Sequence, residues 1–179
     1  MSQPKVRSHV KDADFLFENK PTKVIAIRNS PKIDLAGMSV GPFEEGNEYE
    51  VRFWVAHELE KAGIIRHREE TITASRLYQT LHRERIQPVN NLSSLPDDFY
   101  PRLKRLVEEL KNSSRSSPEK MREYEYVQKL SSDIVGCRLK KIVSLACAPG
   151  QKSQVLRNLT IEELNLYENC LLYTSDAAD

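Results

Sequence analysis

The chain has 179 residues, of which 39% are hydrophobic and 30% charged, and its formal net charge is +1. This length suits one ordinary domain or two small ones, and the composition excludes a disordered chain. The nearly neutral balance excludes a protein that is strongly basic or acidic as a whole. No apolar run is long enough to span a membrane, and residues 1–14 lack the apolar segment of a secretion signal. The three cysteines show no CxxC spacing, so we expect reduced thiols in a cytosol.

The first 53 residues read as short strands separated by turns. KVIAIR (23–28) is an apolar run that ends at an Asn-Ser-Pro turn, and shorter strands are expected at 33–35 and 38–40. After the Gly46-Asn47 turn, EYEVRF (48–53) alternates between apolar and charged residues. A period of two predicts a half-buried strand.

The period then changes to that of a helix. Residues 54–62 fit a short helix that ends at Gly63, which occupies the position where glycine commonly terminates helices. Residues 64–65 are expected to be extended, and 71–85 to form a second helix. Residues 1–86 are therefore predicted to be a small β-rich domain.

Polar residues at 87–94 predict a linker, and a helical domain is expected over 95–169. Asp98 suits an N-cap, and Ser117-Pro118 restarts a helix that runs to about residue 146. Gly136 lies inside that helix, where glycine costs about 1 kcal/mol relative to alanine. Thr160 and Glu163 have the spacing of a capping box, which predicts a last helix through Tyr167. The fold class is α+β.

Residues 170–179, CLLYTSDAAD, resemble the in-frame translation of a sequencing adapter. Helical patterning is strong up to Tyr167 and weakens beyond it. We therefore expect these ten residues to be adapter-derived, with the natural chain cut near Asn169.

The sequence offers no catalytic constellation. His57-Glu58 would begin a zinc-protease motif only with a second histidine at position 61, and Lys61 stands there. Adjacent carboxylates such as Glu162-Glu163 point in different directions on a helix, so surface charge explains them. No glycine-rich phosphate loop is present. We predict no enzyme activity, no metal site and no cofactor.

The helical half is basic although the whole chain is nearly neutral. Between Phe99 and Leu145, eleven Lys and Arg residues face six Asp and Glu residues, an excess of +5. Such an excess fits contact with DNA phosphates or with an acidic partner. An ordinary solvated helix surface explains it as well, because no aromatic residues are interleaved with the charges.

Two segments resemble the GINS family of replication proteins. GPFEEGNEYEVRFWVAHELEKAGII (41–65) is similar to the β-rich B-domain of that family, in which a strand runs into a Trp-containing helix, although Phe53 replaces the usual proline. LPDDFY (95–100), RLKKIVSLA (138–146) and LTIEELNLY (159–167) resemble helices of its A-domain. The B-before-A order resembles the archaeal subunit related to the eukaryotic second and third partner-of-Sld-five proteins.

The resemblance implies a scaffold and not an enzyme. It implies a heterotetramer with a paralogous GINS subunit, and a bridge between the MCM helicase and a RecJ-like partner at the replication fork. The expected location is the archaeal cytoplasm, or the nucleus in a eukaryote. The alternative is a nucleic-acid-binding module that uses the basic helical half, with weak DNA contact.

Some residues are candidates for these roles. Trp54, Phe53 and Leu59 are expected in the B-domain core, with direct partner contact as the other reading of Trp54. The partner-interface candidates, several of which could instead be internal packing, are Phe99, Tyr100, Leu103, Leu106, Leu110, Arg138, Lys140 and Lys141.

Overall fold

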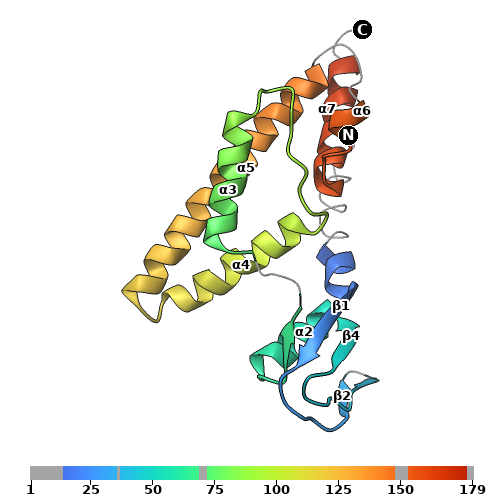
Figure 1. Cartoon of the computed structure of the whole chain (residues 1–179). Coiled ribbons are helices and arrows are strands. Elements are labelled where there is room, and N and C mark those ends of the chain that lie inside the picture. Colours follow the sequence, from blue (N-terminus) through green and yellow to red (C-terminus); the bar gives the residue numbers. More distant parts are fainter. Residues whose placement is uncertain (1–13, 36, 69–71, 148–152, 177–179) are drawn as a thin grey trace. The chain divides into compact units, whose positions relative to one another are not determined.

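The computed structural model describes residues 14–35, 37–68, 72–147 and 153–176. The described chain divides into a β-rich unit up to Thr71 and a helical unit from Ile72 onward (Figure 1). Each unit has its own buried apolar residues. The α+β fold class is confirmed.

The β-rich unit is built on β1 (Pro21–Ala26), which pairs antiparallel with β4 (Glu48–Arg52) on one side and with β5 (Ile65–His67) on the other. A separate hairpin joins β2 (Ile33–Leu35) to β3 (Met38–Val40), so the two short strands are confirmed. β1 begins two residues earlier than expected, because Pro21 and Thr22 pair with the end of β4.

Helix α2 (Phe53–Lys61) follows β4 without a loop, so Phe53 begins the helix and does not end the strand. Leu59 is buried with Val55 and Ala56 against β1, and Trp54 is half-buried against the same cluster. Phe53 is also buried, and its ring contacts that of Phe17 at a centroid distance of 4.3 Å with the two planes tilted by 46°.

The end of α2 is confirmed at Gly63. Its φ is +66°, its N–H donates to the carbonyl of Glu60, and the next N–H, of Ile64, donates to Leu59. These two bonds form a Schellman motif, which needs a left-handed residue at this position. Gly63 therefore sets the angle at which the chain leaves α2 and enters β5.

Gly63→Ala is expected to destabilise the β-rich unit by about 1 kcal/mol, because alanine is strained at positive φ although its Cβ would meet no atom within 4 Å. Trp54 is the only tryptophan of the chain and lies in this unit. Its fluorescence during urea unfolding measures the loss. Gly136→Ala, at a helical glycine in the other unit, is the control and should leave the tryptophan transition in place.

The helical unit is organised around α5 (Pro118–Cys147), a helix of 30 residues, about 45 Å long. Helices α3 (Ala74–Ile86), α4 (Phe99–Ser114) and α7 (Ile161–Asp176) all pack on it, and α6 (Ser153–Leu156) precedes α7 (Figure 1). One apolar cluster holds residues 127–134 of α5 with α3 and α4. A second holds residues 142–146 with Leu92 and Tyr167.

The domain boundary differs from the predicted one. Helix α3 belongs to the helical unit and not to the β-rich domain, because Leu77 and Leu81 are buried against α5. Residues 87–94 are not a free linker: Leu92 and Ser93 are only 1% and 5% exposed. Ser93 and the backbone carbonyls of Asn91 and Leu92 bond to other parts of the helical unit, whereas residues 88–91 and 94 are exposed.

The predicted helix caps are mostly confirmed. Thr160 and Glu163 exchange backbone and side-chain bonds at the start of α7, and the Ser117 hydroxyl accepts from the Lys120 N–H. Asp98 precedes α4 without a side-chain capping bond, and its carboxylate pairs with Arg102 at 3.0 Å. Helix α7 continues to Asp176, past the predicted weakening at Tyr167.

Candidate functional site

The predicted interface residues of α4 turn mainly inward. Phe99 and Leu103 are each 5% exposed and belong to the cluster shared with α3 and α5. Leu106 and Leu110 are half-buried against the same cluster. The apolar stripe of α4 therefore contributes to the core of the helical unit, with only its second half open to solvent.

Arg138 lies at the centre of a buried ion cluster between the two apolar clusters of α5. Its Nη1 lies 2.5 Å from Glu84 Oε1 of α3. Its Nε and Nη2 donate to the two carboxylate oxygens of Glu163 of α7, at 2.5 and 2.7 Å. Lys141, one turn further along α5, binds Glu84 Oε2 at 2.9 Å. Two positive and two negative side chains thus join three helices.

Backbone groups and hydroxyls complete this ion cluster. The carbonyls of Ser93 and Asn158 accept from Arg138, and those of Glu84 and Asn91 accept from Lys141. Glu84 also accepts from the Ser93 N–H and hydroxyl. The segment predicted as a linker is therefore fixed in place by these bonds.

Tyr100 joins the ion cluster from α4. Its hydroxyl donates to Glu163, whose other oxygen accepts from the Thr160 N–H at 3.1 Å. The Glu163 carboxylate thus serves the α7 cap and the ion pair together. Because every charge has an opposite charge and hydrogen-bond donors or acceptors, the cost of burying the four ions is offset.

The pKa values follow from this arrangement. Burial alone would raise the pKa of Glu84, but hydrogen bonds from Ser93 and Lys141 and the charge of Arg138 hold it below its ordinary value. Burial alone would lower the pKa of Arg138, and Glu163 and Glu84 hold it above the usual range. Burial and the charge of Glu163 raise the pKa of the Tyr100 hydroxyl. The cluster therefore holds its charged form near neutral pH.

These positions correct two predictions. Arg138 and Lys141 are 0% and 5% exposed, so they are internal ligands and not surface contacts for a partner or DNA. Glu163, assigned to surface charge, is 3% exposed. Of the three predicted basic contacts, only Lys140 is exposed. The burial of Arg138 could have been predicted from helical spacing. Arg138 lies four residues from both Ile134 and Ile142, which places it on the buried face of α5.

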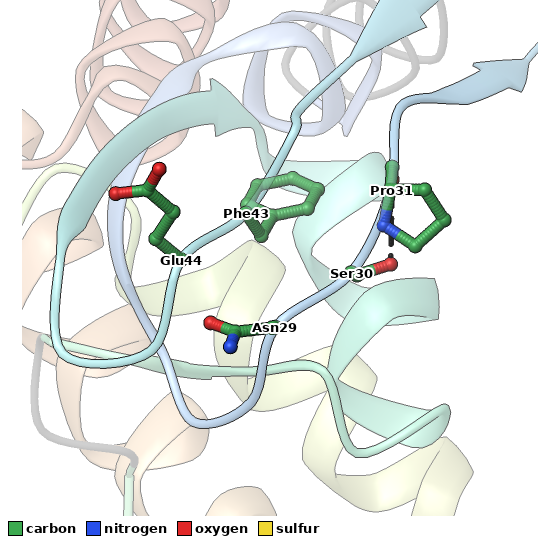
Figure 2. Close-up of a pocket in the computed structure, with 5 residues that line it drawn as sticks. All are labelled: Asn29, Ser30, Pro31, Phe43 and Glu44. Carbon is green, nitrogen blue, oxygen red and sulfur yellow. Dashed lines mark hydrogen bonds between the residues drawn. The ribbon is translucent and has the colours of Figure 1, made fainter.

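The β-rich unit has an open pocket of about 550 Å³ beside Phe43 (Figure 2). Its lining also includes Asn29, Ser30, Pro31 and Glu44. The Ser30 hydroxyl donates to the Pro31 carbonyl, and the Asn29 side chain accepts from the Glu45 N–H. The lining residues include no histidine, lysine or cysteine. The pocket therefore offers no base that would activate the Ser30 hydroxyl as a nucleophile.

Within the described ranges, no three His, Cys, Asp or Glu side chains are grouped to hold a metal ion. Among the helices that the structure describes, none is long and apolar enough to cross a membrane. In the part of the chain that the structure describes, the buried ion pairs of Arg138 and Lys141 thus form an internal site that joins helices to one another.

Comparison with protein families identifies the class of this protein. Residues 9–65 match the PSF2 N-terminal domain, and residues 66–176 match the GINS complex protein helical bundle domain. The chain belongs to the GINS family. No curated protein matched the chain at a significant level.

The family match confirms the predicted class and the order of the β-rich and helical parts. Subunits of this family are non-catalytic scaffold proteins of DNA replication, and they associate with other GINS subunits. The chain is therefore a GINS subunit in replication and not an enzyme.

Proposed function

We propose that this GINS subunit connects the replicative MCM helicase to a RecJ-like protein at the replication fork, as part of a heterotetramer with a paralogous subunit. The observation that carries the proposal is the pair of family matches, which covers both units in the B-before-A order. That order resembles the archaeal form, for which the place of action is the cytoplasm.

Two features of the structure support a connecting role. The β-rich unit has a buried core of its own, around Val24, Phe43 and Leu59, and can therefore bind one protein while the helical unit binds another. The helical unit also keeps large apolar side chains exposed, among them Ile86 and Ile161, each above 60%. Exposed apolar groups of this kind favour protein contacts.

The experiment is a reconstitution with the other GINS subunits, the MCM protein and the RecJ-like protein of the same genome. We expect the complete GINS complex to retain MCM and the RecJ-like protein together in one assembly on a sizing column. Omission of this chain should separate them. Direct binding of MCM to the RecJ-like protein without GINS, or no binding of either to the complex, would contradict the proposal.

The nucleic-acid alternative is weakened by the ion cluster. Removing Arg138 and Lys141 from the count lowers the basic excess between Phe99 and Leu145 from +5 to +3. Lys141 is buried and forms an ion pair with Glu84, so it is not available to a DNA phosphate. Lys140 remains as an exposed candidate for weak DNA contact.

A further inference from the structure

Helix α3 carries an exposed stripe of large side chains that recur about once per turn. Tyr78, His82 and Ile86 are spaced by four residues, so they lie on one face of the helix over about 12 Å. Tyr78 and Ile86 are 56% and 69% exposed, and His82 is exposed as well. Leu77 and Leu81 occupy the buried side of the same helix. We call Tyr78, His82 and Ile86 the α3 stripe.

The two rings of the α3 stripe are ordered by their contact with each other. Tyr78 and His82 stack with ring centroids 6.4 Å apart and with planes only 7° from parallel. Side chains that already hold one another lose less conformational freedom when a partner packs on them. The pair therefore offers a preformed aromatic surface on the outside of α3.

The exposed charges of α3 are all positive. The structure describes this helix in full, and its single acidic residue, Glu84, is 0% exposed. Arg76, Arg83 and Arg85 are exposed. Arg85 is paired with Asp133 of α5 at 2.9 Å, whereas Arg83 has no carboxylate partner among the residues that the structure describes. The surface beside the α3 stripe is therefore complementary to negative charge.

These features select among the possible occupants of the α3 stripe. A second copy is opposed in either direction, because α3 exposes no acidic side chain and arginines would face arginines. A nucleic-acid strand leaves Ile86 without a partner, because an aliphatic side chain is stabilised by contact with apolar groups and not with phosphates. Permanent subunit interfaces are large and apolar, whereas this stripe covers about two turns and is bordered by arginines. A short segment with apolar and acidic side chains matches both properties.

We propose that the α3 stripe binds a short acidic amphipathic segment of a protein that the assembled GINS complex recruits. In this contact, apolar side chains of the segment pack on Tyr78, His82 and Ile86, and an Asp or Glu side chain pairs with Arg83. The inference rests on the connecting role proposed above only in that the complex recruits other proteins. It adds a docking site on the helical unit and does not depend on the MCM or RecJ-like contact.

The test is a binding titration of the complete GINS complex with a fluorescently labelled synthetic peptide of about 16 residues, four to five helical turns. Leucine recurs in the peptide every three or four residues, and glutamate stands beside the leucines. A scrambled peptide of the same composition is its control. We expect fluorescence anisotropy to show saturable binding of the amphipathic peptide. The Kd of the scrambled peptide should be at least about tenfold higher, because its leucines no longer share one face.

Two variants locate this binding on α3. Arg83→Glu should raise the Kd at least about tenfold and make it less sensitive to salt, because repulsion replaces attraction. Tyr78→Ala should raise it about tenfold, because buried aromatic anchors commonly dominate such contacts. The matched controls, Lys129→Glu and Tyr126→Ala, change exposed residues of α5 and should bind the peptide normally. Circular dichroism should be unchanged in all of them, since each side chain is exposed.

The remaining outcomes overturn the inference. If the wild-type complex binds neither peptide, or both equally, or if Arg83→Glu and Lys129→Glu weaken binding alike, the α3 stripe is not a specific site. Binding to the isolated chain but not to the complex would assign the stripe to a subunit contact. Tighter binding of a thymidine oligonucleotide, lost in both α3 variants, would assign it to nucleic acid. Failure of the complex to retain MCM and the RecJ-like protein contradicts the proposed function and leaves the peptide result standing.

Discussion

Arg138→Met is expected to lower the free energy of unfolding of the helical unit by about 3–5 kcal/mol. The methionine fills much of the same space but leaves Glu163 buried, where the Tyr100 hydroxyl and the Thr160 N–H remain to stabilise its charge. Glu84 keeps Lys141 and Ser93, yet loses its shortest ion pair. An uncompensated buried carboxylate must either stay charged at a high cost or take up a proton.

Two optical signals can localise this effect to one unit. Far-ultraviolet circular dichroism follows mainly the helical unit, which holds α3, α4, α5 and α7, while fluorescence follows Trp54 of the β-rich unit. The circular dichroism transition in urea should move to lower denaturant in Arg138→Met. Lys140→Met, at the exposed neighbouring position, is the control and should move it little. Equal shifts in the two variants would show that the ion cluster is not what stabilises the helices.

Local signals predicted the elements well. Gly63, the Ser117 cap and the Thr160–Glu163 box each act within a few residues, so their backbone consequences could be derived from neighbours in the sequence. The alternation over 48–52 likewise depends only on the two faces of one strand.

Contacts between residues far apart in the sequence could not be predicted from such local signals. Arg138 was predicted to be a candidate partner contact, whereas a charged residue is fully buried only where it has partners. Its partners, Glu84 and Glu163, lie 54 and 25 residues away in the sequence. No spacing rule connects them, although the apolar period of α5 does place Arg138 on the inner face.

The misplaced domain boundary has the same physical origin. Helix α3 and the polar segment after it look, by composition, like the end of one domain and a loop. Their place is decided by Leu81 and Glu84, which are buried against α5. Within residues 87–94, the backbone carbonyls of Ser93 and Asn91 accept from the buried cations Arg138 and Lys141.

Glu84→Gln is expected to cost about 3 kcal/mol at neutral pH, and its loss should depend on pH. The amide retains the shape of the carboxylate but removes the charge that faces Arg138 and Lys141, and its NH₂ group would point at one of their donors. The pKa of Glu84 is lower in the folded chain than its ordinary value of 4.5. Its contribution is therefore complete above about pH 4.5 and is lost as the pH falls through the folded pKa.

Urea unfolding followed by circular dichroism at a series of pH values tests this sign. The difference in stability between wild type and Glu84→Gln should be constant near neutral pH and shrink toward acid, because the wild-type carboxylate is then protonated as well. Glu108→Gln, at an exposed carboxylate of α4, should show a small difference at every pH. A difference for Glu84→Gln that grows as the pH falls would contradict a buried, ionised Glu84 and with it the charge balance that joins α3, α5 and α7.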